Sequence, residues 1–280
     1  MSLAAETKMG RLELRVRDMD QVLDFYTRGV GLTPMSDGPG SASLGLGGKE
    51  LVRLSEAKDL RPAAPGSAGL FHTAILFDEQ PMLAGALERM ARHFGHTYVG
   101  SGDHLVSQAF YFTDPEGNGV ELYHDRPRDQ WTWLDGQVHM DTLFIDPNEY
   151  LASHLDDSSQ QEAIGDLGHV HLQVGDIATA KQFYVDALGF DQTATLGNQA
   201  LFVSAGGYHH HMAMNVWNSR GAAPRSSTLG MGVVDIEVPT VGNLEATRQR
   251  LMENGHTPTF DGRTLIVNDP WNNEIRLAAA

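Results

Sequence analysis

Apolar and polar side chains alternate over several short stretches, and segments with helical spacing lie between them. Residues 71–77 and 110–112 are typical of strands, whereas residues 81–94 have the spacing of an amphipathic helix. Turn residues at 114–119 separate the strand at 110–112 from a second strand at 120–123. The pattern therefore predicts a fold of mixed strands and helices, with a hairpin between residues 110 and 123.

The pattern of the N-terminal half recurs in the C-terminal half. Leu14 and Gly31 reappear without a gap as Leu172 and Gly189, a shift of 158 residues (172 − 14 = 158). The hairpin recurs with a shift of 155 residues (269 − 114 = 155). Such self-similarity indicates a duplicated unit. The other matched pairs are Val16/Val174, Asp18/Asp176, Phe25/Phe183, Tyr26/Tyr184, Asp114/Asp269, Pro115/Pro270, Asn118/Asn273, Val120/Ile275 and Leu122/Leu277.

Each half divides again into two strand–helix–strand–strand–strand modules. The four modules cover residues 9–55, 70–124, 166–217 and 231–278. We therefore expect an α+β fold of four βαβββ modules in two tandem domains, 9–125 and 166–278, joined by a connector at 126–165. The connector carries Trp131 and Trp133, which we expect to pack onto a domain surface, with a lid over a ligand as the alternative.

Composition narrows the classes of function. The chain carries 20 basic and 36 acidic residues, a net charge of −16, which argues against binding to nucleic acid or to anionic membranes. No apolar run reaches the roughly 18 residues of a membrane span, and the N-terminus lacks the pattern of a signal peptide, so we expect a cytoplasmic protein. Without cysteine, a metal would have to be held by His and carboxylate groups.

The hairpin holds the first candidate for chemistry. Glu121 stands in an apolar strand and shares one face with Tyr123, while Val120 and Leu122 take the opposite face. A lone Glu on a strand is often a solvated edge charge, which is the structural alternative. His104 and Tyr111 precede Glu121, and each could equally be an ordinary loop or core residue.

The spacing of His104, Tyr111, Asp114-Pro115 and Glu121 resembles the signature of extradiol ring-cleavage dioxygenases. These enzymes belong to the vicinal oxygen chelate superfamily, which also contains glyoxalase I. In that signature the Glu is an iron ligand, and the resemblance implies that His104 and Tyr111 act beside the substrate. The four-module form of the same fold curls paired modules around a metal cleft.

In that family, further ligands come from the first strands of modules. The resemblance implies a metal site of His72, Glu121 and His169, which requires module two to pair with module three. Any one of these residues could instead be a core or surface residue, and Glu274 in module four is a fallback ligand. The equivalent positions of modules one and four hold residues that would leave a second, inactive cleft: Arg11, Val233 and Arg276.

A run of three histidines, residues 209–211, follows His169 by about forty residues, where extradiol enzymes place an acid–base catalyst. If these residues form a strand, His209 and His211 point one way and His210 the other. We expect His211 to be the catalyst, and a solvated strand edge is the structural alternative.

The resemblance implies an iron(II)-dependent extradiol dioxygenase that cleaves a small aromatic diol with O₂, with Mn(II) or another divalent metal as the alternative cofactor. A glyoxalase-type isomerase on the same fold is the second reading, and it usually requires a second Glu ligand. A non-catalytic binding or resistance protein is the third. Assembly into a homo-oligomer is compatible with each of them.

Overall fold

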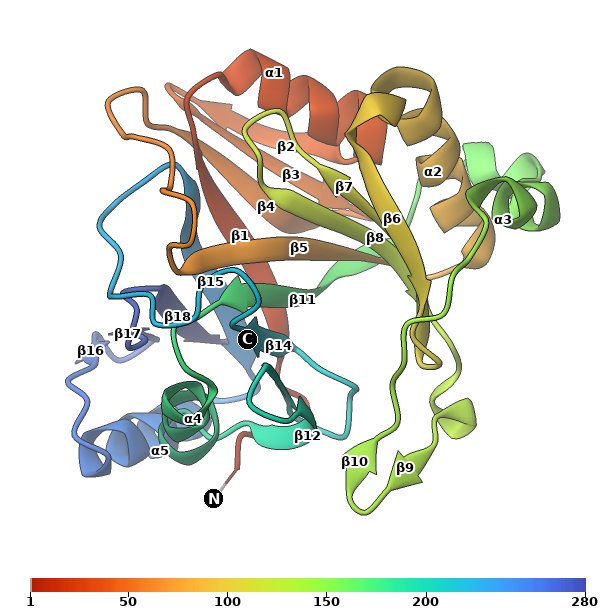
Figure 1. Ribbon diagram of the computed structural model, residues 1–280. Coiled ribbons are helices and arrows are strands. Elements are labelled where there is room, and N and C mark those ends of the chain that lie inside the picture. Colours follow the sequence, from red (N-terminus) through yellow and green to blue (C-terminus); the bar gives the residue numbers. More distant parts are fainter. Residues whose placement is uncertain (1) are drawn as a thin grey trace.

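A computed structural model describes residues 2–280, apart from the side chain of residue 37. Two eight-stranded sheets dominate the described part of the chain, and helices cover their outer faces (Figure 1). The first sheet has the order β16 (Thr259–Phe260), β17 (Thr264–Asn268), β18 (Glu274–Ala279), β15 (Gly230–Val238), β1 (Lys8–Val16), β4 (Lys49–Glu56), β3 (Ser41–Leu46) and β2 (Thr33–Gly38).

The second sheet has the same arrangement. Its order is β12 (Asp191–Leu196), β13 (Ala200–Ser204), β14 (Met212–Asn215), β11 (Gly165–Gln173), β5 (Gly69–Phe77), β8 (Gly119–Asp125), β7 (Ser107–Thr113) and β6 (Tyr98–Asp103). The four-module α+β fold is confirmed, and the predicted hairpin is the β7–β8 pair.

Each sheet joins modules from both halves of the chain. β1 of module one pairs antiparallel with β15 of module four, and β5 of module two pairs antiparallel with β11 of module three. The pairing of modules two and three therefore creates one sheet, here called sheet B, and modules one and four create sheet A. The ranges 9–125, 126–165 and 166–278 describe the order of the modules along the chain and stay a prediction as domain boundaries.

The helix after the first strand is alike in both repeats. α1 (Met19–Asp24) continues as a π-helical segment, η1 (Phe25–Val30), and α4 (Ile177–Lys181) continues as η5 (Gln182–Ala187). Asp18 and Asp176 cap these helices by accepting backbone N–H bonds, as short acidic side chains do at N-caps. The remaining helices are α2 (Gln80–Phe94), α3 (Pro147–His154), α5 (Val241–Glu253) and the 3₁₀ turns η2 (Gly95–Thr97), η3 (Arg128–Gln130) and η4 (Asp157–Gln160).

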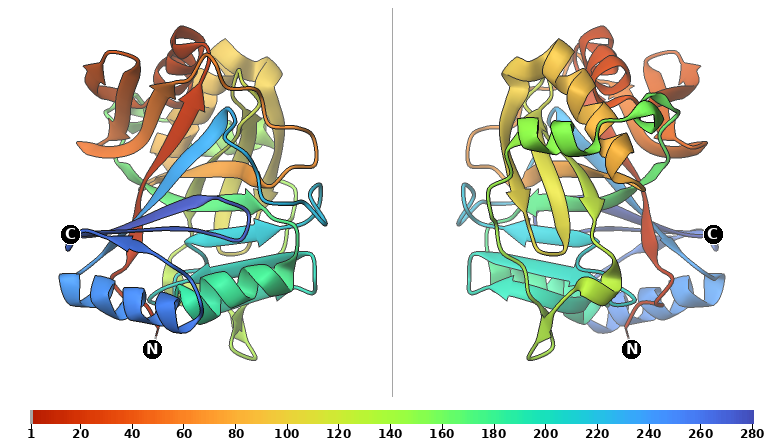
Figure 2. Two further views of the ribbon diagram at one scale, coloured as in Figure 1. Left: turned by 90° about the vertical axis from the view of Figure 1, so that its left-hand side faces the viewer. Right: turned by 90° about the vertical axis from the view of Figure 1, so that its right-hand side faces the viewer.

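One apolar core runs through both sheets. The middle strands β1 and β11 contact one another, and the sheets cross where they meet (Figure 2). Val120 and Leu122 belong to this core, while Tyr123 packs in a separate cluster on the opposite face of sheet B. The predicted alternation of β8 is therefore confirmed, and it leaves Glu121 on the face away from the main core.

The connector between the two halves contains regular secondary structure. It forms a small hairpin, β9 (Trp133–Leu134) with β10 (Gln137–Val138), and then α3, which packs on α2. Trp131 packs against Tyr208 as expected, but Trp133 is exposed. No helix within residues 2–280 combines the length and the apolar character that crossing a membrane requires.

Candidate metal centre

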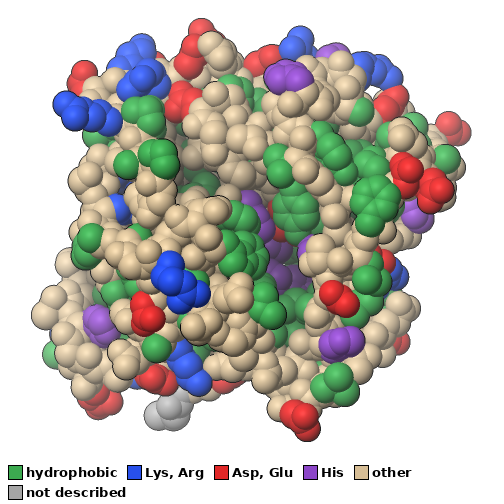
Figure 3. Space-filling view, viewed as in Figure 1, with side chains coloured by type: hydrophobic (Ala, Val, Ile, Leu, Met, Phe, Trp, Pro, Cys, Tyr) green, Lys and Arg blue, Asp and Glu red, His purple; other side chains and the backbone are tan. Residues whose placement is uncertain are grey.

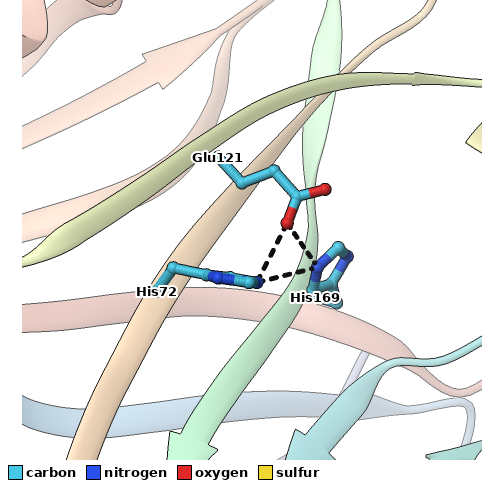
Figure 4. Close-up of side chains that lie close together, drawn as sticks. All are labelled: His72, Glu121 and His169. Carbon is cyan, nitrogen blue, oxygen red and sulfur yellow. Dashed lines mark hydrogen bonds and ion pairs between the residues drawn. The ribbon is translucent and has the colours of Figure 1, made fainter. Parts of the chain in front are cut away.

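Three side chains from three neighbouring strands of sheet B point toward one another (Figure 4). Oε2 of Glu121 on β8 lies 2.9 Å from Nε2 of His72 on β5 and 3.2 Å from Nε2 of His169 on β11. The two Nε2 atoms are 3.4 Å apart. β8 is an inner strand and Glu121 is 2% exposed, so the alternative of a solvated edge charge is wrong.

The donor set fits a divalent metal. Ligand atoms about 2.0–2.2 Å from a metal and at right angles to one another lie about 3 Å apart, close to the three distances here. Two imidazoles and one carboxylate on one side of an ion form a facial triad, the set typical of non-haem iron(II) oxygenases. Within the described residues, no other group of three His, Asp or Glu side chains converges as tightly.

Burial and mutual contact hold the three groups ready to bind a cation. Burial alone would raise the pKa of Glu121, but His169 and His72 outweigh it and keep that pKa well below its usual range. Burial lowers the pKa of His169 to about 4, against the opposing effect of Glu121. The carboxylate is therefore ionised and the His169 imidazole neutral near pH 7, as metal binding requires.

A local irregularity of β11 places His169. The pairing of β11 with β5 shifts between Leu167 and His169, and Gly168 lies at the shift. A Cβ atom on Gly168 would lie only 1.7 Å from the hydroxyl oxygen of Tyr123, so glycine is required for this close approach. Nδ1 of His169 has no hydrogen-bond partner among the described residues. The ring is held instead by packing against Tyr123 and His210.

His104 and Tyr111 lie together beside this cluster. The carbonyl of Asp141 accepts a bond from Nδ1–H of His104 at 2.8 Å. Nε2 of His104 must therefore accept from the hydroxyl of Tyr111 at 2.6 Å. The Tyr111 ring packs at a tilt against that of His72, with the ring centroids 5.6 Å apart. Burial, with Glu121 nearby, raises the pKa of Tyr111 well above its usual value, so its phenol keeps the proton.

The structure places His210, rather than His211, at the cavity. Residues 205–211 form the loop between β13 and β14, so strand alternation does not apply to them. The ring centroid of His210 is 4.1 Å from that of His169, and His210 lines the cavity. His211 does not line it: Nδ1 of His211 accepts from the backbone N–H of Ala205, and its ring packs on Tyr208.

His209 and Asp125 hold the His210 ring through a chain of hydrogen bonds. Nε2–H of His209 donates to Oδ1 of Asp125 at 2.9 Å. Nδ1 of His209 is then the acceptor for Nδ1–H of His210, at 2.8 Å. This pattern leaves Nε2 of His210 unprotonated, and burial, with His169 and His209 nearby, lowers the pKa of His210 well below its usual value. No pattern in the sequence links these three histidines to Asp125.

The cluster lies in a deep hollow with histidines at its bottom and hydrophobic side chains around it (Figure 3). The cavity has a volume of about 840 Å³. His171 and Trp217, which were not predicted as site residues, line its wall, as does the connector between Leu134 and Thr142. His171 is fixed by Asn215, whose Nδ2 donates to its Nε2 at 3.0 Å. The connector thus forms part of a pocket. This agrees better with the expected alternative of a lid over a ligand than with simple packing onto a domain surface.

The equivalent face of sheet A holds a different cluster. Asp235 accepts bonds from Nε of Arg11 at 2.9 Å and from Nε of Arg276 at 2.6 Å, and Arg11 also contacts Glu50. Arg cannot act as a ligand because it stays protonated. Glu274, the fallback ligand, lies on this sheet and belongs to no metal-like group within the described residues.

Comparison with known proteins places the chain in a family. A sequence model of the Glyoxalase/Bleomycin resistance protein/Dioxygenase superfamily matches residues 8–122 and 166–277. The chain is 34% identical over 276 residues to a catechol-2,3-dioxygenase of Bacillus subtilis (strain 168), and the match covers 96% of each chain.

Solved structures share the fold at low identity. A putative dioxygenase of Bacillus subtilis superposes with a TM-score of 0.67 at 13% identity, covering 100% of this chain and 86% of its own. Glyoxalase I from Zea mays superposes with a TM-score of 0.59 at 18% identity, covering 98% and 92%. The duplicated modules, the two crossed sheets and these matches agree, and the chain belongs to the glyoxalase/bleomycin resistance/dioxygenase superfamily.

Proposed function

We propose that the chain is an iron(II)-dependent extradiol dioxygenase, which cleaves a catechol-like aromatic ring and adds both atoms of O₂. The observation that carries the proposal is the convergence of Glu121, His72 and His169 at distances that suit a facial triad. The 34% identity to a catechol-2,3-dioxygenase over almost the whole chain supports the same activity.

His72, Glu121 and His169 would hold the iron and leave about three positions open for substrate and O₂. When bound, iron(II) supplies the redox chemistry that joins O₂ to the aromatic ring. The triad lies at the floor of a cavity, whose walls limit the access of water to the reacting groups.

His210 is the proposed acid–base residue in place of His211. Its Nε2 would take a proton from a hydroxyl group of the diol and return it later in the reaction. Asp125 and His209 act through His210, because their hydrogen bonds fix the tautomer in which Nε2 is the acceptor.

His104 and Tyr111 are the proposed substrate-side pair. The carbonyl of Asp141 keeps the Nδ1 proton on His104, so its Nε2 can accept either the Tyr111 hydroxyl or a hydroxyl of the substrate. Tyr111 remains a phenol and can donate a hydrogen bond to an oxygen of the bound diol.

The alternatives fit the cluster less well. A glyoxalase-type isomerase usually requires a second Glu ligand, and the cluster contains a single carboxylate among the described residues. A binding or resistance protein would not need the two imidazoles and the buried carboxylate to converge. We therefore favour the dioxygenase.

The test is oxygen consumption by protein purified without air and loaded with iron(II). Addition of catechol should consume about one O₂ per catechol and produce a yellow ring-opened product. Parallel loading with Mn(II) would identify the metal that supports turnover. Absence of oxygen uptake with every catechol tried, after verified metal loading, would contradict the proposal.

A further inference from the structure

The cavity above the triad has an unusual charge composition. None of the described residues that line it is Lys or Arg, and its acidic members are Glu121 and Asp141. Arg126, near the connector, is paired with Asp103 and does not line the cavity. An anionic group on a part of the ligand away from the metal would therefore lose its water and find no Lys or Arg side chain, while Asp141 opposes it.

The wall between the triad and the cavity mouth is apolar. Phe71 packs against His72 with ring centroids 5.3 Å apart and against Trp217 at 5.4 Å. Trp217 is 46% exposed and stands at the mouth. This aromatic wall extends the surface that an aromatic ring would contact when its diol lies at the triad.

A further part of the cavity rim comes from the connector hairpin and β12. Leu134 and Leu196 line the cavity and are 54% and 56% exposed. The side chain of Gln137 accepts a bond from the backbone N–H of Thr195 at 3.0 Å, which ties the hairpin to β12. Val138, deeper in the wall, is buried. Exposed leucines at a fixed cavity mouth are suited to contact an apolar group of a ligand.

The size of the cavity exceeds the need of a single ring. Its volume of about 840 Å³ falls within the range of roughly 300–1,000 Å³ that holds drug-sized ligands. Room for a substituent therefore remains when a dihydroxylated ring occupies the polar end.

We propose that the substrate is an uncharged catechol with an apolar substituent, and that this substituent lies between Trp217 and the leucines at the mouth. This inference rests on the proposed dioxygenase function and names the class of diol that the site accepts. Catechols with a carboxylate on the substituent are poor substrates, because the cavity offers that carboxylate no cation.

The experiment compares 3,4-dihydroxyphenylacetate with its methyl ester, which share the ring and side chain and differ in charge. The iron-loaded protein should cleave the ester with a kcat/KM at least about tenfold higher. Ligand binding without oxygen, followed by tryptophan fluorescence, should show the same order of affinity. A catechol with a propyl group in place of the ester should be cleaved at least as well as catechol itself.

A variant at the mouth tests where the substituent lies. Leu196→Arg adds a cation at an exposed position and should reduce the ester preference by at least about fivefold, chiefly by improving the acid. Leu196→Gln removes the apolar contact without adding charge, and Met252→Arg adds the same charge on the exposed surface of α5. Both controls should keep a preference for the ester.

The outcomes distinguish a failure of this inference from a failure of the proposed dioxygenase function. Cleavage of the acid as fast as the ester would overturn the substrate class and leave the dioxygenase intact. An unchanged ratio in Leu196→Arg would overturn the placement of the substituent at the mouth. If no catechol is cleaved and neither compound binds, the proposed function fails and the inference fails with it.

Discussion

Sheets A and B place a carboxylate between two nitrogen-bearing side chains in different ways. In sheet B, Glu121 lies between His72 and His169. In sheet A, Asp235 lies between Arg11 and Arg276, which occupy the positions equivalent to His169 and Glu121. Sheet B therefore has a cluster that can bind a cation. In the cluster of sheet A, the two arginine side chains already supply the positive charge.

The comparison shows that the fold provides the positions and that the side chains decide the chemistry. The sheet B cluster is almost fully buried, whereas the side chains of Arg11, Asp235 and Arg276 are 17–31% exposed. Partly exposed ion pairs contribute modestly to stability and bind no metal. We therefore propose metal binding for sheet B and a structural role for the ion pairs of sheet A.

Removal of the carboxylate of sheet B has the largest expected effect. Glu121→Gln should lower metal affinity by more than about a hundredfold, because changes to residues outside the ligand set already cost roughly 10- to 100-fold. Metal content after gel filtration measures the loss. Glu274→Gln on sheet A is the matched control and should retain the metal; loss of metal in that variant instead would move the site to the C-terminal modules.

The next prediction separates two adjacent histidines of the β13–β14 loop. His210→Gln should lower kcat by about 10²–10⁴-fold and leave the metal bound, as expected for loss of an acid–base residue. His211→Gln lies outside the cavity and should keep kcat within about threefold after correction for folded protein. Steady-state kinetics on metal-loaded variants measures both. A larger loss of kcat in His211→Gln would restore His211 as the catalyst.

The ion pairs of sheet A should affect stability without affecting turnover. Asp235→Asn should lower the free energy of unfolding by about 1–2 kcal/mol, because it leaves the partly buried guanidinium group of Arg276 without its carboxylate partner and leaves Arg11 with Glu50 alone. Urea unfolding measures the change. Glu245→Gln, from the exposed Glu245–Arg248 pair, should change it by less than about 0.5 kcal/mol. Loss of bound metal in Asp235→Asn would show that the two sheets are not independent.

An effect of similar size, seen only in the pH dependence of stability, is expected at the β7–β8 turn. Burial raises the pKa of Asp114 to about 6, although backbone bonds from Glu116 and Asn118 oppose the rise. In the unfolded chain the pKa of an Asp carboxyl group is about 3.9. Because the pKa is higher in the folded chain, the contribution of Asp114 to the free energy of unfolding is largest below pH 4 and is lost as the pH rises through 6. Asp114→Asn should reduce the decline in the free energy of unfolding between low and neutral pH by about 1–2 kcal/mol.

Urea unfolding at pH 4.5 and 7.5 measures the difference between the Asp114→Asn variant and the original chain. Asp269 is the equivalent residue of sheet A, and burial also raises its pKa, so Asp269→Asn should shift the pH dependence in the same direction. Identical pH dependence in the variants and the original chain would contradict both assignments.

The sequence predicts the fold because the fold follows from repeated local patterns, and it predicts the metal cluster because the resemblance to extradiol dioxygenases marks the ligand positions within those patterns. The shift of 158 residues aligns His169 with Arg11 and identifies which modules hold histidine at the ligand position. Antiparallel pairing of β5 with β11 then brings the ligands together. The modules and their strands depend on periodicity, which is visible in the residues themselves.

The parts that the sequence did not predict depend on irregular backbone. His209–His211 lie in a loop, where alternation gives no direction, so the inward position of His210 could not be derived. The connector follows no regular period, and its contribution of residues such as Leu134 and Met140 to the cavity wall arises from tertiary packing. The hydrogen bond between His209 and Asp125 joins residues 84 positions apart.

The most direct test of this account is the number of metal ions per chain. Metal-free protein should be titrated with iron(II) under argon, with binding followed by calorimetry and the bound iron measured after desalting. One equivalent per chain, absent in Glu121→Gln, is the predicted result. Two equivalents would mean that sheet A also binds metal, and none would mean that the converging side chains of sheet B are not a metal site.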